Sequence, residues 1–248
     1  MNKSIAIQFN RVSKSYPIYS HLGAGLKGFI FNLPKALKGL ARERFTALEN
    51  ISFDINRGET VAFMGRNGAG KSTTLGLIAQ VLKSTSGTVA VHGRVSPLLE
   101  LGGGFHSDLT GRENILLNGV LLGLSRKTIK EKEDSIIGFS ELGNFIDQPI
   151  RMYSSGMLSR LGFSVVAHLD PEILLVDEVL AVGDIAFQEK CKNKITEFKK
   201  SGVTIVLVSH SIDDVRKLCD RVIWIENHKI QMDGPTTEVL PVYEKYFV

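Results

Sequence analysis

Hydrophobic residues recur along the chain with two spacings, and each spacing predicts a kind of secondary structure. Alternation of apolar and polar positions, which is typical of half-buried strands, is found at residues 5–9 and 51–55. Unbroken apolar runs are typical of strands that are buried on both faces of a parallel sheet. Three runs of this kind, two of which include one threonine, occupy residues 60–64, 173–176 and 203–208. The chain is therefore predicted to combine an antiparallel element with a parallel sheet.

Helical spacing dominates the middle of the chain, after a glycine-rich joint at residues 101–105. Thr110 and Glu113 have the spacing of a capping box, in which each side chain bonds the other residue's backbone N–H. Helices are predicted over residues 72–81, 115–124, 127–139 and 153–167. A hairpin around Asn227-His228 and a short amphipathic helix are predicted near the last residues.

Residues 21–45 combine an apolar stripe at helical spacing with an excess of basic side chains over the one acid, Glu43. The basic residues are Lys27, Lys35, Lys38, Arg42 and Arg44. A basic amphipathic segment can lie on anionic lipid headgroups or on the membrane-proximal surface of a partner. It can equally be a surface helix whose apolar side packs on its own domain. The pattern alone leaves both interpretations open.

Composition places the 248-residue chain among globular proteins, because 43% of its residues are apolar and 23% are charged. The net charge of +4 is too small to argue for nucleic acid, so no nucleic-acid partner is expected. No signal sequence and no apolar run of membrane-spanning length is recognisable, so a soluble or peripheral protein of the cytoplasm is expected. Cys191 and Cys219 have neither metal-binding nor disulfide spacing.

The strongest chemical signal is a phosphate-binding loop: residues 65–72 match the pattern G-x-x-x-x-G-K-[ST]. A predicted strand and a predicted helix on either side disfavour the alternative of an ordinary glycine-rich turn. Glycines let backbone N–H groups curl around an anion, and the helix N-terminus adds partial positive charge. Lys71 is predicted to reach the β- and γ-phosphates of a nucleotide, and the Ser72 hydroxyl to bind Mg²⁺. The nucleotide-binding candidates here are Gly65, Arg66, Asn67, Gly68, Ala69, Gly70, Lys71, Ser72 and Thr73.

Two acidic residues follow the predicted strand at 173–176. Asp177 stands at the C-terminal end of that strand, where α/β sheets bind ligands, and is predicted to hold Mg²⁺ through water. Glu178 is then placed to polarise an attacking water molecule. His210 follows the next buried strand, where a histidine can bond a γ-phosphate, although a lone histidine there is more often structural.

Two further segments hold weaker candidates. Tyr16 and Tyr19 are expected in a polar turn region, where an aromatic ring can stack on adenine or simply pack on the sheet. Ser154, Ser155 and Gly156 begin a predicted helix, and such a start suits either an anion or a plain N-cap. Taken alone, each segment favours the structural interpretation.

In this order, the motifs resemble the nucleotide-binding subunit of an ATP-binding cassette transporter over the whole chain. The resemblance implies an α/β fold with a P-loop (RecA-like) core, an antiparallel β subdomain and a helical subdomain. Residues 1–248 would then be one nucleotide-binding domain, with its core at about 1–104 and 167–248. The basic amphipathic insert would occupy 21–45, and the helical subdomain about 105–166.

The same resemblance implies an ATPase that works as a head-to-tail homodimer, with ATP and Mg²⁺ as cofactors. Each ATP would lie between the phosphate loop of one chain and Ser154 and Gly156 of the other. Glu178 would be the catalytic base and His210 the γ-phosphate sensor. Tyr16 would be the aromatic ring that stacks on the adenine.

Departures from the family pattern narrow the resemblance. The usual Leu-Ser-Gly-Gly-Gln signature is Tyr-Ser-Ser-Gly-Met at residues 153–157, and Asp184 falls in the loop that would cross the dimer interface. Glu100 stands where the family has a glutamine that touches Mg²⁺. A carboxylate is a competent Mg²⁺ ligand, so Glu100 joins Ser72 and Asp177 as a metal candidate.

These variants are similar to the ATPases of bacterial polysaccharide exporters. The similarity implies export of a lipid-linked polysaccharide, in the first place lipopolysaccharide O-antigen, with capsular polysaccharide or teichoic acid as alternatives. The partners would be two copies of a separate transmembrane permease and the membrane surface, at the cytoplasmic face of the bacterial inner membrane. Residues 21–45 are similar to an inserted gating helix of that group, and no C-terminal carbohydrate-binding domain is expected. A cassette ATPase acting on ribosomes or DNA and a phosphate-loop kinase are weaker alternatives.

Overall fold

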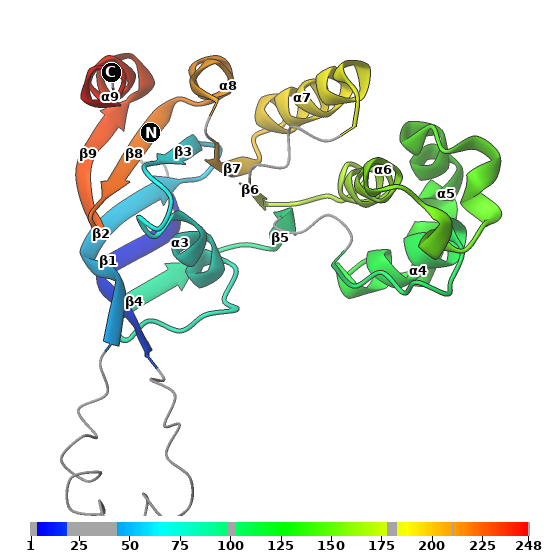
Figure 1. Cartoon of the computed structure of the whole chain (residues 1–248), viewed down its shortest axis with the longest axis horizontal. Helices are drawn as coiled ribbons and strands as arrows, with labels where there is room; N and C mark the ends of the chain where they lie inside the picture. Colours follow the sequence, from blue (N-terminus) through cyan, green and yellow to red (C-terminus); the bar gives the residue numbers. More distant parts are fainter. Residues whose placement is uncertain (1–3, 19–43, 99–102, 178–182, 210, 248) are drawn as a thin grey trace, which may run out of the picture.

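Two β-sheets and a group of helices make up the part of the chain that the structure describes, residues 4–18, 44–98, 103–177, 183–209 and 211–247 (Figure 1). The structure is a computed structural model of the single chain. Within these ranges no helix combines the length and the hydropathy that a membrane span requires. The elements agree with the predicted α/β fold that contains an antiparallel sheet and a helical group.

An antiparallel sheet of three strands, in the order β2-β1-β4, confirms the predicted antiparallel element. Its strands are β1 (Ile5–Pro17), β2 (Arg44–Asn56) and β4 (Ser86–Val91). The ladder between β1 and β2 continues as far as Pro17 and Arg44. The expectation that Tyr16 lies in a polar turn is therefore wrong. Tyr16 is paired with Phe45 in the ladder, because the neighbouring strand supplies partners for its backbone polar groups.

The second sheet has six strands in the order β5-β6-β7-β3-β8-β9. The strands are β3 (Thr60–Met64), β5 (Val95–Leu98), β6 (Ile173–Asp177), β7 (Thr204–Val208), β8 (Arg221–Glu226) and β9 (Lys229–Pro235). Neighbours are parallel except β8 and β9, which form the predicted hairpin. Asn227 and His228 have φ of 49° and 67°, as a two-residue type I′ turn requires. The edge strand β5 escapes sequence prediction, because it is short and contains Pro97, which sheets tolerate only at an edge or a bulge.

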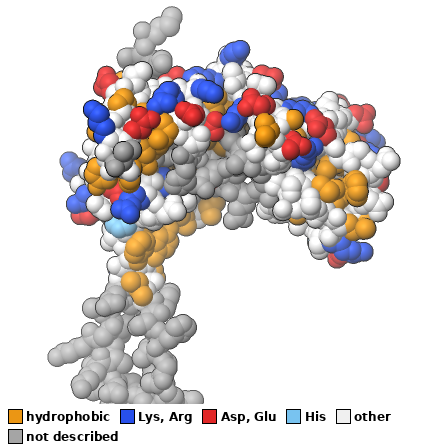
Figure 2. Space-filling model, turned by 45° about the horizontal axis from the view of Figure 1, so that its top comes forward, with side chains coloured by type: hydrophobic (Ala, Val, Ile, Leu, Met, Phe, Trp, Pro, Cys, Tyr) orange, Lys and Arg blue, Asp and Glu red, His pale blue; other side chains and the backbone are white. Residues whose placement is uncertain are grey.

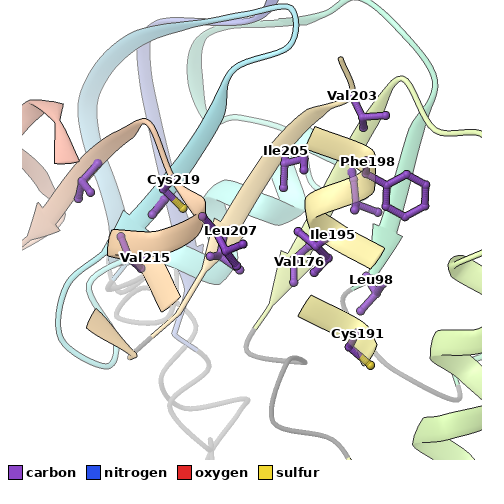
Figure 3. Close-up of a cluster of buried hydrophobic side chains, with 14 of the residues drawn as sticks. Leu98, Val176, Cys191, Ile195, Phe198, Val203, Ile205, Leu207, Val215 and Cys219 are labelled. Carbon is purple, nitrogen blue, oxygen red and sulfur yellow. The ribbon is translucent and has the colours of Figure 1, made fainter. Parts of the chain in front are cut away.

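Along its central strands β3, β6 and β7, the six-stranded sheet is buried on both faces, as the apolar runs predict. On β6, Leu174 and Val176 lie in one hydrophobic cluster and Leu175 lies in the other. The first cluster includes the buried cysteines Cys191 and Cys219, which are both free thiols (Figure 3). It is covered by α7 (Ile185–Lys200), α8 (Ile212–Leu218) and α9 (Thr236–Phe247). The second is covered by the three-stranded sheet and α3 (Lys71–Ile78).

The remaining helices form a group of their own beside the six-stranded sheet (Figure 1). They are α4 (Gly111–Leu121), α5 (Arg126–Ser140), η1 (Gly143–Asp147), η2 (Ile150–Met152) and α6 (Ser155–Val166). The predicted capping box is confirmed, since Thr110 Oγ1 accepts from Glu113 N and Glu113 Oε2 accepts from Thr110 N. Helix α6 links this group to the core, because Leu161 and Val165 lie in its hydrophobic cluster and Phe163 lies in the core cluster.

Candidate active site

The predicted phosphate loop joins the buried strand β3 to helix α3 and turns at three glycines. Gly65, Gly68 and Gly70 have φ of 145°, 81° and 113°, which residues with a Cβ rarely adopt. A Cβ at Gly65 would also collide with the carbonyl oxygen of Ile225. A Cβ at Gly70 would come within 2.5 Å of the carbonyl oxygen of Ala47. The path of the loop therefore depends on glycine, above all at the two positions that other backbone segments crowd.

Lys71 is buried in the first turn of α3, and its side chain reaches back to the start of the loop. Its Nζ donates hydrogen bonds to the carbonyl oxygens of Gly65, at 2.8 Å, and Arg66, at 3.0 Å. The backbone N–H of Arg66 donates to Glu226 Oε2 at 3.4 Å, at the end of β8. The ammonium and the helix N-terminus both favour an anion here. A phosphate at this position would compete with the two carbonyl oxygens for the Lys71 ammonium.

A cavity of about 290 Å³ opens beside the loop. It is lined by Phe45, Ala47, Asn67, Gly68, Gly70, Lys71, Ser72 and Thr73. The structure thus brings six of the nine candidates of residues 65–73 to one cavity. Gly65, Arg66 and Ala69 do not line it. The carbonyl oxygens of Gly65 and Arg66 instead accept hydrogen bonds from Lys71 Nζ.

Among the described residues that line this cavity, Phe45 is the aromatic one, and the sequence pattern places it only in the basic insert. Phe45 is 46% exposed, and its ring meets His228 edge to face, with 5.5 Å between the ring centroids. Tyr16, its partner in the β-ladder, is not part of the lining; the Lys14 ammonium lies 4.9 Å from the centroid of its ring. The alternation of Phe45 and Ala47 with polar residues is the signal that β2 begins this early. The role of Tyr16 at the adenine stays a prediction.

Asp177 ends β6 at the same edge of the sheet as the phosphate loop. In the ladders Asp177 is paired with Val208 of β7, and Val208 with Phe63 of β3. The carboxyl ends of these three parallel strands therefore lie side by side, and β3 leads directly into Gly65. This is the edge where parallel α/β sheets bind ligands.

Ser154 and Gly156 stand at the start of α6, beside α4 and α5 and apart from α3 (Figure 1). Ser154 is the N-cap, and its Oγ accepts a hydrogen bond from Met157 N at 3.2 Å. Among the described residues, a Cβ at Gly156 would approach only Ser154 Oγ, at 3.8 Å, so they leave the surface beside this first turn open. Neither residue lines the cavity beside the loop of its own chain.

Several predicted residues lie outside the described part of the chain. These are Glu178, His210, Glu100 and Tyr19, together with residues 21–43 of the insert. The strands that lead to Glu178 and His210 end at the edge that carries the phosphate loop. The roles of these residues stay predictions.

Comparison with known proteins decides the family. The model that describes ABC transporters matches residues 48–181, from β2 to beyond the end of β6. The chain belongs to the ABC transporter family. It is an ATP-binding ATPase of that family, whose cassettes form dimers and act with transmembrane permeases. The match confirms the resemblance that the order of the motifs indicates.

The relatives of this ABC ATPase include proteins of polysaccharide export. The O-antigen export system ATP-binding protein RfbB of Klebsiella pneumoniae is 56% identical over 96% of this chain and 97% of its own length. The teichoic acids export ATP-binding protein TagH of Listeria innocua is 45% identical over 99% of this chain but only 72% of its own length. A solved dimer of the ATP-binding cassette MJ0796, bound to ADP and Pi, matches with a TM-score of 0.73 at 21% identity, covering 93% of this chain and 98% of that one. This likeness confirms the predicted cassette fold.

Proposed function

We propose that the chain hydrolyses ATP to drive export of a lipid-linked polysaccharide, in the first place O-antigen, across the bacterial inner membrane. One observation carries this choice of cargo. The chain matches an O-antigen export ATPase at 56% identity over nearly the full length of both proteins, whereas a teichoic acid export relative is less similar and extends beyond the match. Capsular polysaccharide and teichoic acid are the alternative cargoes. The chain would act at the cytoplasmic face of the membrane with two copies of a separate permease.

The phosphate loop is the proposed binding site of the ATP phosphates. The backbone of residues 65–73 would surround them, and Lys71 would exchange its bonds to Gly65 and Arg66 for bonds to the β- and γ-phosphates. Phe45, at the rim of the same cavity, would contact the base together with Tyr16 on the neighbouring strand. Support comes from the position of the buried ammonium at the start of the loop and from the open cavity beside it.

A hydroxyl and carboxylates are suitable ligands for Mg²⁺, and the chain offers Ser72 in the cavity lining and Asp177 at the adjacent strand end. With Glu100 they form the proposed metal-binding set. The metal would neutralise charge on the phosphates. Glu178, directly after Asp177, would accept the proton of the attacking water, and His210 would donate a hydrogen bond to the γ-phosphate.

We propose that the chain reaches its active form as a head-to-tail homodimer. The open start of α6, with Ser154 and Gly156, would close over the ATP held by the phosphate loop of the other copy. Backbone N–H groups at the helix N-terminus and the Ser154 hydroxyl are suited to an anion. A single chain keeps these residues away from its own cavity, so the site would be completed only by the second copy.

The test is Glu178→Gln, measured in the purified chain and in cells. Turnover should fall by about 10²-fold or more, as expected for loss of a general base, while ATP still causes dimerisation. Glu172→Gln, which removes an exposed carboxylate paired with Arg57 at the other end of β6, is the matched control and should keep normal turnover. Normal hydrolysis by Glu178→Gln would disprove the assigned base.

In the source cell, Glu178→Gln should remove one surface polysaccharide and cause its lipid-linked precursor to accumulate inside. The polysaccharide that disappears identifies the cargo. If every surface glycan is unchanged, the ATPase assignment stands and the proposed cargo is wrong.

A further inference from the structure

Ionic contacts join the helical group to the core where α5, α6 and α7 meet. Arg160 of α6 is at their centre, with a side chain that is only 18% exposed. Its Nη2 donates to Asp184 Oδ2 at 2.7 Å, and its Nη1 donates to Glu141 Oε2 at 3.2 Å. The guanidinium also lies 4.9 Å from the ring centroid of Phe187 on α7. One cation thus holds two carboxylates that are far apart in sequence and rests on a ring of the core.

Both carboxylate oxygens of Asp184 are engaged. Oδ2 is bound by Arg160, and Oδ1 accepts from Phe187 N at 2.9 Å as the N-cap of α7. The preceding residue, Gly183, has φ of 74°, and a Cβ there would lie 3.5 Å from Arg160 Nε. The backbone that leads into α7 is therefore held by its own helix on one side and by α6 on the other.

A second ion pair crosses at the same place. Glu141, the C-cap of α5, has φ of 57°, and its Oε1 accepts from Lys190 Nζ of α7 at 2.7 Å. Lys190 also donates to the carbonyl oxygen of Phe139 at 2.9 Å and lies 4.5 Å from the centroid of the Phe139 ring. The hydrogen bond from Lys190 lowers the pKa of Glu141, with a smaller charge contribution from Arg160. Glu141 is therefore ionised at neutral pH and bridges the two cations.

The position of Arg160 in the chain links this network to the proposed dimer site. Arg160 follows Gly156 by four residues, about one turn of the same helix. Asp184 is the N-cap of α7, and the resemblance to the cassette family implies that it belongs to the loop at the dimer interface. A helix is stiff over one turn, so a contact that fixes Arg160 against Asp184 also fixes the start of α6 against the start of α7.

We propose that Arg160 is a positioning residue: by binding Asp184 and Glu141 together, it holds the start of α6 and the start of α7 in the one arrangement that a second copy of the chain can close upon. This inference rests on the proposed head-to-tail dimer. The proposal predicts different effects on ATP binding by a single chain and on ATP-dependent dimerisation, whereas a general loss of folding would lower both. ATP binding to a single chain uses the phosphate loop and does not depend on Arg160, whereas ATP-dependent dimerisation and turnover do.

The experiment uses the full-length chain with Arg160→Gln and Arg160→Lys. Asp184→Asn is the third variant, because asparagine is as good an N-cap as aspartate and removes only the charge. Acidic and basic side chains are mixed over the visible surface (Figure 2), so ion pairs are common on this protein. The control variant must therefore also remove an arginine that bridges two carboxylates. Arg216 serves, since it binds Asp213 at 3.2 Å and Glu244 at 2.6 Å, joining α8 to α9. Arg216→Gln removes the same chemistry away from α6.

Four quantities are measured: turnover at saturating ATP, affinity of dilute single chains for a non-hydrolysable ATP analogue, ATP-dependent dimerisation in the Glu178→Gln background, and Tm. Arg160→Gln and Asp184→Asn should each lower turnover and dimerisation by about tenfold, and the double variant should lose little more, because the residues form one contact. Analogue affinity should stay within about twofold. Arg160→Lys should recover part of the turnover, and Arg216→Gln should change neither turnover nor dimerisation.

The inference is overturned if Arg160→Gln lowers Tm but leaves turnover and dimerisation normal well below the melting range. It is also overturned if the analogue affinity of single chains falls as much as turnover does. Failure of the proposed function gives a different result: the Glu178→Gln chain with Arg160 intact would then not dimerise with ATP at all.

Discussion

The phosphate loop and the start of α6 are proposed to bind the same ATP from opposite sides, yet they are built in different ways. The loop is shaped by its own backbone: Lys71 bonds carbonyl oxygens five and six residues before it, and glycines make the turns. The start of α6 is held by side chains from distant elements. Arg160 reaches partners 19 and 24 residues away, and Tyr153 Oη donates to the carbonyl oxygen of Phe145 at 2.6 Å. One side is therefore sensitive to backbone changes and the other to side-chain changes.

The largest effect on stability is expected in the phosphate loop, which is shaped by its backbone. Gly65→Ala should destabilise the fold by about 3 kcal/mol or more, because the added Cβ meets the carbonyl oxygen of Ile225 and φ is positive. ATP binding should be lost with it. Gly68→Ala is the control, since φ is also positive there but no atom of the described residues lies within 4 Å of the added Cβ. It should cost only about 1 kcal/mol. Urea denaturation and ATP titration measure both variants, and equal effects would show that crowding at Ile225 is unimportant.

This difference also decides what the sequence could predict. The phosphate loop and the capping box at Thr110 are complete within a few consecutive residues, so their spacing is sufficient evidence for their geometry. The buried strands are predictable because apolar runs need no partner to be recognised. Phe45 and Arg160 are not predictable in this way, because the cavity beside one and the carboxylates around the other come together only through the tertiary fold. Strand β5 is missed because Pro97 argues against a strand until its place at the sheet edge is known.

The next largest effect on stability is expected near the start of α6, at Gly111, the first residue of α4. A Cβ there would collide with Tyr153 Oη and lie 2.9 Å from Ile146 Cδ1, so Gly111→Ala should cost about 2 kcal/mol. Tyr153→Phe alone should cost about 1 kcal/mol, for the hydrogen bond to Phe145. The double variant should cost about 1 kcal/mol less than the sum, because the colliding oxygen is gone.

Gly138→Ala is the matched control for this pair. Gly138 lies within α5, and an added Cβ would have no neighbour within 4 Å in the part of the chain that the structure describes. Since glycine is a poor helix former, the change should stabilise the protein by up to about 1 kcal/mol. The free energies of unfolding are measured by urea denaturation. If the losses caused by Gly111→Ala and Tyr153→Phe are strictly additive, the Tyr153 hydroxyl is not what excludes a Cβ at position 111.

A smaller effect tests whether the side chain of Phe45 contributes to ATP binding beside the phosphate loop. Phe45→Ala should weaken ATP binding by about fivefold or more, as expected for loss of a base–aromatic contact. Binding of inorganic triphosphate, which has no base, should be unchanged. Tyr16→Ala in the same assay compares the predicted adenine partner with the residue that lines the cavity. If only Tyr16→Ala weakens ATP binding, Phe45 has no part in holding the base.

The smallest effect is a pH dependence on the α6 side, at His168. This residue follows α6, its Nδ1 donates to the carbonyl oxygen of Ser164 at 2.7 Å, and its ring meets Phe139 edge to face. Burial lowers the pKa of His168, and the charges of Lys194 and Lys132 lower it further against the opposing effect of the Ser164 carbonyl. The unfolded chain therefore binds a proton at a higher pH than the folded chain does, so the proton favours unfolding.

Above the ordinary histidine pKa of about 6.5, His168 is neutral in both states and its contribution to stability is complete. As the pH falls below that value, the free energy of unfolding should decrease until the lower pKa of the folded state is passed. His168→Asn keeps a donor for Ser164 but cannot titrate, so its Tm should fall less between pH 7.5 and 5.5 than that of the unmodified chain. Equal falls in Tm would mean that His168 is as easily protonated in the fold as in the unfolded chain, and that the interior of the α5–α6 junction is open to water.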